Sequence, residues 1–202
     1  MKRLSVFLVI IALLGTIIFI CMQKKPANGK ANDVLCRLES ILEDGDIIFR
    51  LGDRPWSMII KDIATNKKEY SHVGIIKRKK DVTVISAETL NFDGKDGVVD
   101  ESLEKFIYVA QSVGIYRLQS SERNRISRIA GEYIGKPFDW EFDIKDDSRI
   151  YCSELLYVVL GRIRPDIILN TVYIKEIKKD VIPLDVCEGN KDFKEIIQIK
   201  LK

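Results

Sequence analysis

Residues 72–88 read HVGIIKRKKDVTVISAE, and this stretch decides the fold. Two runs rich in β-branched residues, 72–78 and 82–88, flank the charged turn KKD. Runs of this composition separated by a short polar turn are typical of paired strands. The stretch therefore predicts a β-hairpin, and it places the only histidine of the chain, His72, at the start of the first strand.

The segments around this hairpin mix strands with helices. Further strands are predicted at 47–51, 113–118 and 195–200, and helices at 34–42, 56–63, 101–107, 120–135 and 151–162. Asp100 is the expected N-cap of the helix at 101–107. Strand and helix do not alternate regularly, as they would in a doubly wound sheet. We therefore expect an α+β fold with a small, mostly antiparallel sheet packed with helices.

The N-terminus predicts a membrane segment. After a cationic start, residues 4–22 contain no charged residue, and a run of this length can cross a bilayer as a helix. We predict a transmembrane helix or signal anchor at 1–22, a polar linker at 23–33 and one domain at 34–202. The expected location is the bacterial cell envelope, with the domain outside the cytoplasm and the membrane as a partner.

Two alternatives to a retained anchor remain open. A cleaved signal usually ends in small residues, whereas the bulky IIFICM stands before QKKP here. Cys21 suggests a lipoprotein, but Ile20 occupies the position where lipid attachment needs a small residue. A retained anchor is therefore preferred to both.

Composition limits the partners and cofactors. The net charge is only +3 over 202 residues, and no basic run is interleaved with aromatics, so no nucleic-acid partner is expected. With one histidine and no CxxC pair, neither a zinc site nor another cofactor is expected. Of the three cysteines in the domain, Cys36 and Cys187 could form a disulfide, which would leave Cys152 free.

Cys152 is the candidate nucleophile. It follows a polar and aromatic loop at 136–150 and begins the predicted helix CSELLYVVLGRI. A helix N-terminus and a neighbouring imidazole both lower the pKa of a thiol, and the free N–H groups at a helix start can hold an oxyanion. The alternative is a core cysteine, because Cys152, Leu155, Leu156, Val159 and Ile163 form one apolar stripe.

His72 is the only imidazole that could serve this cysteine. On the following strand, Ser86 and Glu88 are two residues apart and therefore share a face. Glu88 is the better electrostatic partner for an imidazolium, whereas Ser86 could only accept a hydrogen bond. The alternatives are a capping histidine at a strand edge and a polar pair on a solvated face.

Five motifs in order resemble a known family. They are GDIIF, SMIIKDIATNKKEYSHVGII, VISAE, GKPFDWEF and YCSELLYVV, which span roughly residues 41–163. Together they are similar to the YiiX/YebB-like family of circularly permuted NlpC-type, papain-like cysteine hydrolases. The resemblance implies a permuted papain-like fold with Cys152 as nucleophile, His72 as general base and a polar residue on the adjacent strand as the third member.

The resemblance also extends to auxiliary residues. The family commonly has a glutamate where this chain has Ser86, so the acid is displaced to Glu88, which the strand period keeps on the same face. By the same resemblance, Tyr151 is an aromatic neighbour of the nucleophile that helps the oxyanion hole or substrate binding. Tyr70 is expected to line the pocket, and Asp46 is expected to serve the turn before its strand.

Three functions follow from these observations. The first is a membrane-anchored cysteine hydrolase that cleaves an amide bond, in a cell-wall peptide or a related amide, through a thioacyl intermediate. The second is a lipid-directed acyl hydrolase or acyltransferase with the same Cys-His chemistry, which the apolar stripe at 56–63 would suit. The third is a catalytically silent binding module. A deep apolar groove beside Cys152 would favour the lipid substrate, and a polar cleft the peptide.

Overall fold

The computed structural model describes residues 29–65, 69–89 and 96–201. The chain divides into two compact units, Met1–Cys36 and Arg37–Lys202, and the second contains the sheet. Helix α2 (Gly29–Ile41) begins inside the segment predicted as a linker. The membrane segment predicted at 1–22 lies outside the described residues. Within the described ranges, no helix is long and apolar enough to cross a membrane.

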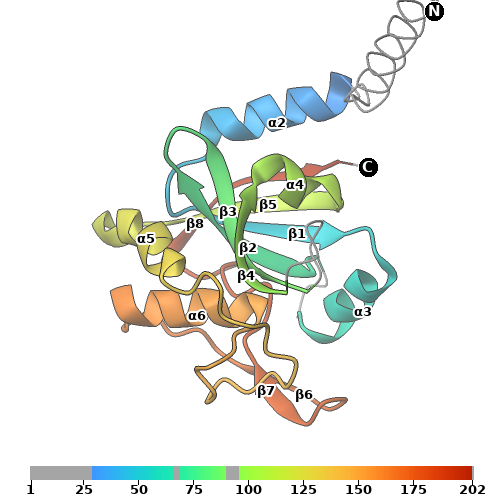
Figure 1. Ribbon diagram of the computed structural model, residues 1–202, viewed down its shortest axis with the longest axis vertical. Helices are drawn as coiled ribbons and strands as arrows, with labels where there is room; N and C mark the ends of the chain where they lie inside the picture. The colour runs from blue at the N-terminus through green and yellow to red at the C-terminus, as the bar shows by residue number, and fades with distance from the viewer. Residues whose placement is uncertain (1–28, 66–68, 90–95, 202) are drawn as a thin grey trace, which may run out of the picture. The chain divides into compact units, whose positions relative to one another are not determined.

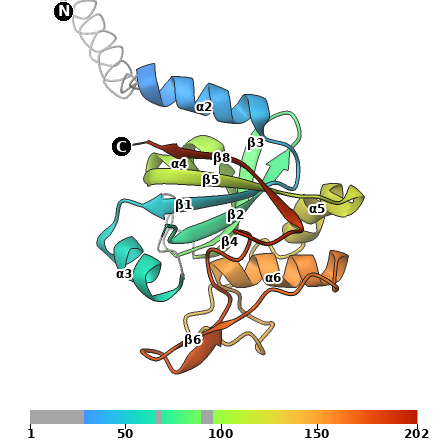
Figure 2. The same cartoon turned by 180° about the vertical axis from the view of Figure 1, so that it is seen from behind.

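A six-stranded antiparallel sheet forms the centre of the second unit (Figures 1 and 2). Its strand order is β4-β3-β2-β1-β5-β8. The strands are β1 (Ile47–Gly52), β2 (His72–Arg78), β3 (Val82–Glu88), β4 (Gly97–Ser102), β5 (Ala110–Leu118) and β8 (Phe193–Lys200). Two short strands, β6 (Val172–Ile174) and β7 (Lys179–Val181), pair separately. The predicted hairpin is confirmed, with Ile75 opposite Ile85.

Helices lie on both faces of this sheet. Helices α5 (Ile126–Gly131) and α6 (Cys152–Ile163) lie on one face and α4 (Leu103–Tyr108) on the other (Figure 1). Helix α3 (Pro55–Ile63) follows β1, with proline in its first turn, where a missing N–H costs nothing. The main core packs alternate strand residues against α5 and α6. Its buried members include Phe49, Val73, Ile75, Ile85, Ile129, Leu155, Leu156 and Val159. The predicted α+β class is confirmed.

Helix α4 begins later than predicted. Asp100, the expected N-cap, belongs to β4, and the cap is Ser102, whose Oγ accepts a hydrogen bond from Lys105 N at 3.3 Å. Val98 and Val99 are buried where β4 pairs with β3, so strand pairing outweighs the local capping signal.

Another helix differs from its prediction. The helix predicted at 120–135 is broken into a 3-10 turn, η1 (Ser121–Arg125), and α5, which ends at Gly131. Of the two cysteines that could have formed a disulfide, Cys36 is an exposed free thiol and Cys187 a buried one. Asp46 does serve its turn, accepting a hydrogen bond from Glu43 N at 2.8 Å.

Candidate active site

The start of helix α6 is fixed from two sides. Its N-cap, Tyr151, donates its backbone N–H to Glu154 Oε2 at 3.1 Å. The Tyr151 hydroxyl accepts from Ile182 N at 3.1 Å, and Ser153 Oγ donates to Ile182 O at 2.6 Å. Tyr151 and Ser153 are buried, whereas Cys152 between them is partly exposed. The Cys152 side chain is therefore held at the helix start while it remains accessible.

Three adjacent strands bring Arg50, His72 and Glu88 into one row. Arg50 on β1 pairs with His72 on β2. The register that places Ile75 opposite Ile85, continued to the strand ends, places His72 opposite Glu88 on β3. His72 is the first residue of its strand and Glu88 is the last of its own, so both side chains lie at the same end of the sheet.

His72 links Glu88 to Cys152. Its Nε2 lies 2.7 Å from Glu88 Oε1. Cys152 lines the same cleft as this imidazole, and its side chain contributes to the raised pKa of His72. Because Nε2 faces Glu88, Nδ1 is the nitrogen that remains for the sulfur. The structure thus brings the three predicted residues together in the order Cys152, His72, Glu88.

Ser86 supports Glu88 rather than His72. Its buried Oγ donates to Glu88 Oε1 at 3.0 Å. Glu88 is only 6 % exposed, so the alternative of a polar pair on a solvated face is wrong. Displacing the acid by two positions therefore leaves a carboxylate in contact with the imidazole.

Arg50 was not singled out from the sequence. Its Nη2 donates to both oxygens of Glu88, at 3.0 and 2.9 Å, and its Nη1 donates to Phe106 O at 2.9 Å. The guanidinium carbon lies 4.2 Å from the centroid of the Phe106 ring. A signal was present in IIFRL, because an arginine inside a buried strand requires a charged partner.

The charges in the row shift the proton affinities of its members. Burial lowers the pKa of His72, but the Glu88 carboxylate outweighs it and raises the pKa to about 9. Burial would raise the pKa of Glu88, but the charges of His72 and Arg50 hold it well below its usual range. At neutral pH, His72 is therefore an imidazolium beside a carboxylate, which is the form that stabilises a thiolate.

The two auxiliary tyrosines lie in different places. Tyr151 lines the cleft beside Cys152, and burial raises the pKa of its hydroxyl above the ordinary value. Tyr70 packs in the core, with its ring centroid 5.3 Å from that of Phe49, and a Cβ on Gly114 would lie 2.1 Å from its hydroxyl oxygen. The expectation that Tyr70 lines the pocket is therefore wrong.

A cleft of about 590 Å³ opens beside Cys152. Most of its wall is apolar, from α3, the loop after Pro137 and the region around β6 and β7. These wall residues include Ile60, Ile63, Phe138, Phe142, Ile174 and Leu184. Charged groups also line it, among them Glu101, whose pKa burial and the Glu88 charge raise to about 7.

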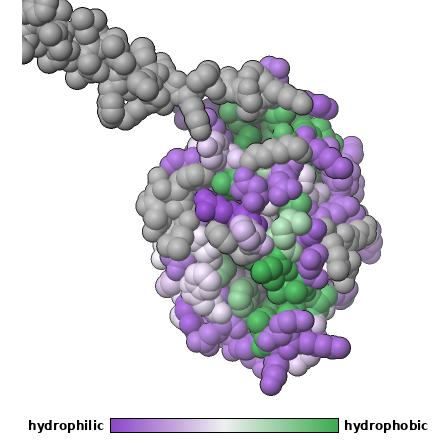
Figure 3. Space-filling model, turned by 90° about the vertical axis from the view of Figure 1, so that its right-hand side faces the viewer, coloured by the Kyte–Doolittle hydropathy of each residue, from purple (hydrophilic) through white to green (hydrophobic). Residues whose placement is uncertain are grey.

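Apolar residues also reach the surface near this cleft. Figure 3 looks onto the side of the molecule that carries α3 and shows hydrophobic residues flanked by hydrophilic ones. On α3 itself, Ile59 is 61 % exposed, and Trp140 in the cleft wall is 60 % exposed. The surface around the cleft is thus apolar as well.

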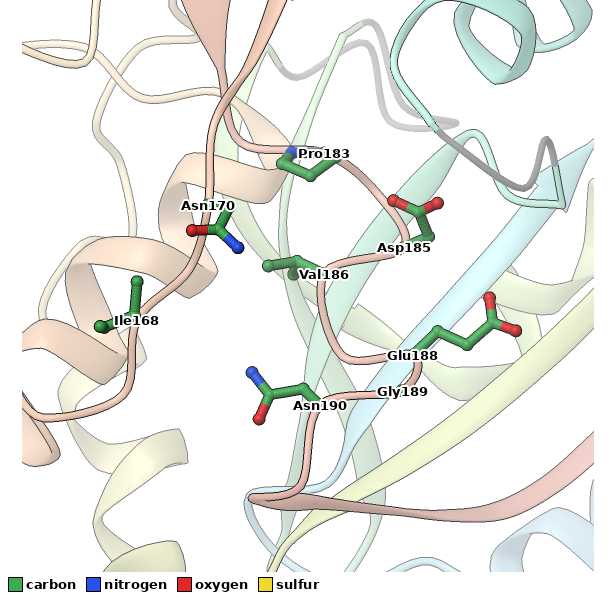
Figure 4. Close-up of a pocket in the computed structure, with 8 residues that line it drawn as sticks. All are labelled: Ile168, Asn170, Pro183, Asp185, Val186, Glu188, Gly189 and Asn190. Atoms are coloured by element: carbon green, nitrogen blue, oxygen red, sulfur yellow. The ribbon is translucent and has the colours of Figure 1, made fainter.

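A second pocket, of about 350 Å³, is separate from this site (Figure 4). It lies in the segments around Asn170 and Asn190, whose amides point into the space between them, whereas the carboxylates of Asp185 and Glu188 turn away. Neither a cysteine nor a histidine lines it. The candidate active site is therefore the cleft at Cys152.

Comparisons with known proteins agree with this geometry. A family model described as "Permuted papain-like amidase enzyme, YaeF/YiiX, C92 family" matches residues 41–176, more than half of the chain. The Uncharacterized protein YiiX of Escherichia coli (strain K12) is 31 % identical over 119 residues. That alignment covers 58 % of this chain and 56 % of the relative, so the chain spans little more than half the length of the curated relative that it matches.

A solved structure shares the fold. It is the crystal structure of a protein described as the metalloprotein yiiX from Escherichia coli O157:H7, with a TM-score of 0.64 and 21 % identity. The match covers 78 % of this chain and 98 % of that one. In the part of this chain that the structure describes, no group of three or more His, Cys, Asp or Glu side chains could hold a metal. The Nε2 of His72 is already paired with Glu88 Oε1 at 2.7 Å, so these residues do not fit a metal site.

Proposed function

We propose that this chain, which belongs to the YaeF/YiiX family of permuted papain-like amidases, hydrolyses an amide bond with Cys152, His72 and Glu88 through a thioacyl intermediate. The family that the five motifs predicted is confirmed. The observation that carries the proposal is that Cys152, the first residue of α6, shares one cleft with the hydrogen-bonded pair of His72 and Glu88. A peptide of the cell wall or a related amide is the proposed substrate.

The geometry supports a two-step reaction. The Cys152 sulfur attacks the carbonyl carbon, and the C–N bond breaks as His72 gives its proton to the leaving amine. Water then attacks the thioester, with His72 accepting its proton, and Cys152 is released. The first helical bond of α6 runs from Leu155 N to Tyr151 O, so N–H groups at the helix start remain for the oxyanion.

Thiol labelling tests the nucleophile. Iodoacetamide at pH 6 should alkylate Cys152 about tenfold or more faster than the exposed Cys36, because an ordinary thiol is almost wholly protonated there. Peptide mass spectrometry separates the two rates within one sample. His72→Ala should slow Cys152 and leave Cys36 unchanged. Equal rates at both cysteines, or no effect of His72→Ala, would contradict the proposal.

The apolar cleft favours a second candidate, a lipid-directed acyl hydrolase or acyltransferase. The wall built by side chains such as Ile60, Phe138 and Leu184 would accept a hydrocarbon chain beside the sulfur. Burial of each CH₂ is worth about 0.8 kcal/mol, so kcat/KM should rise roughly fourfold per added carbon in a series of N-acyl amides. A flat series, with a peptide amide cleaved faster, would favour the peptide substrate instead.

We propose that the domain is held at the membrane and faces outward from the cytoplasm. The uncharged run at 4–22 supports an anchor. A membrane-impermeant maleimide applied to intact cells should label Cys36, and a Cys36→Ser variant identifies that signal. Labelling only after lysis would show that the domain lies inside the cell. Recovery of the protein in the fraction without membranes would contradict the anchor.

A further inference from the structure

We propose that Arg50 is a positioning residue of this site: its guanidinium holds the Glu88 carboxylate ionised and aimed at His72 Nε2. This inference rests on the proposed function but concerns a residue outside its catalytic series. The carrying observation is the contact of one guanidinium with both carboxylate oxygens, in the same row of strand residues as the imidazole.

The guanidinium is itself fixed in place. Its Nη1 donates to the carbonyl of Phe106, and its carbon lies over the Phe106 ring at 4.2 Å from the centroid, so two contacts with α4 restrain it independently of Glu88. The side chains of Arg50 and Glu88 are only 10 % and 8 % exposed. Because Nη2 contacts both carboxylate oxygens while Nη1 is held by the Phe106 carbonyl, this pair sets the direction in which Glu88 presents its Oε1 to His72.

The charge of Arg50 acts on His72 in the opposite sense to Glu88. Glu88 favours the imidazolium, whereas the Arg50 cation disfavours it. His72 must hold a proton beside the sulfur and then release it to the leaving amine, so neither extreme of proton affinity suits it. Arg50 thus keeps Glu88 ionised while limiting how tightly the imidazole holds its proton.

The other charged groups around His72 do not replace this effect. Glu88 faces it from β3 and Cys152 from α6, and Glu101 on β4 and Lys105 on α4 line the same cleft. Arg50 is a main cationic cause of the shifts at both His72 and Glu88, and Lys105 lowers the pKa of Glu101. Removal of the Arg50 charge should therefore be felt directly at His72.

The single histidine makes this inference measurable without any substrate. One imidazole resonance in the NMR spectrum reports the titration of His72. In Arg50→Gln, a nearby positive charge is lost, and the midpoint should move upward by about one unit or more. In Arg50→Lys, the charge remains while the two-point contact is lost, so the midpoint should stay near that of the unaltered protein.

Measurements of kcat/KM distinguish the positioning effect of Arg50 from the effect of its charge. Arg50→Gln should lower kcat/KM about a hundredfold at pH 7, because Glu88 is no longer held in orientation. Its alkaline limit should move to higher pH together with the NMR midpoint. Arg50→Lys should recover part of kcat without moving that limit.

Arg117 on β5 provides a matched control. It also holds both oxygens of a buried carboxylate, although through two nitrogens: its Nε donates to Asp46 Oδ1 at 2.7 Å and its Nη2 to Asp46 Oδ2 at 2.8 Å, and Asp46 is fully buried. Arg117→Gln should therefore cost comparable stability and leave the His72 midpoint unchanged.

Three results would overturn the inference. They are an unmoved His72 midpoint in Arg50→Gln, an equal shift in Arg117→Gln, and activity losses that only follow the folded fraction. Should Arg50→Gln fail to fold, an Arg50→Lys variant with unaltered kcat would also refute it, because the two-point contact would then be dispensable. A protein without any amidase activity refutes the proposed function alone, since the NMR titration remains informative.

Discussion

Replacing Glu88 by glutamine should lower the pKa of His72 from above its ordinary value to below it. In the unaltered protein, the Glu88 carboxylate overcomes burial and raises the pKa of His72 to about 9, against an ordinary value of 6.5. Without that charge, burial and the Arg50 cation both disfavour the imidazolium, so the pKa should fall below 6.5. The change exceeds 2.5 units, which corresponds to more than about 3.4 kcal/mol of lost imidazolium stabilisation at about 1.36 kcal/mol per unit.

The variant should also lose stability. Glutamine leaves the Arg50 guanidinium buried without its counter-charge, and breaking such a pair costs about 3–5 kcal/mol. Because the pKa of His72 is raised in the folded state, its contribution is full below pH 6.5 and is lost as the pH rises to about 9. The deficit of Glu88→Gln in the free energy of unfolding should thus be larger at pH 6 than at pH 9.

Two measurements decide this prediction. NMR titration of the single imidazole gives the midpoint, and the pH profile of kcat/KM gives the activity, which should fall about a hundredfold or more at pH 7. Ser86→Ala removes one hydrogen bond to Glu88 and keeps the charge, so it should cost only about 1 kcal/mol and leave the midpoint raised. A midpoint that stays near 9 in Glu88→Gln would refute the assigned source of the shift.

Three further predictions concern the surroundings of the site. Glu101→Gln removes a buried carboxyl whose pKa is raised to about 7, so that its ionised form destabilises the fold. The melting temperature of this variant should therefore rise by a few degrees at pH 8 and change little at pH 5. Gly114→Ala places a Cβ 2.1 Å from the Tyr70 hydroxyl oxygen and should lower the free energy of unfolding, measured by urea titration, by about 1–3 kcal/mol. Tyr151→Phe removes the acceptor for Ile182 N, so kcat/KM should fall while the His72 titration is unchanged.

The hairpin and the cysteine helix could be predicted because their signals are local. Runs rich in β-branched residues around KKD specify β2 and β3, and a polar loop followed by an apolar run specifies α6. The single imidazole left His72 as the only histidine that could serve Cys152, and the family resemblance implied their pairing. These inferences did not depend on knowing how distant segments meet.

The remaining features depend on tertiary pairing. The segment GVVDES becomes β4 because it pairs with β3. A capping pattern centred on Asp100 contains no information about that pairing. Tyr70 precedes the histidine in sequence, yet it packs over Gly114 on β5. The sequence could not predict this position, because no local rule fixes which part of the core a buried ring fills. The pair of β6 and β7 is only three residues long per strand, too short for a periodic signal.

The choice between Ser86 and Glu88 also depended on register. In the pairing of β2 with β3, residue 86 stands across from Gly74 and residue 88 across from His72. A Cβ at Gly74 would approach Ser86 Cβ to 3.3 Å, so the glycine leaves room for the side chain that supports the acid. The displaced glutamate is thus placed opposite the imidazole by the strand pairing itself, and the Arg50 side chain reaches the same carboxylate from β1, the strand beyond His72. Buried ion pairs add little to stability after desolvation, so this row of one carboxylate and two cations is better explained by the proton transfer that it can support at Cys152.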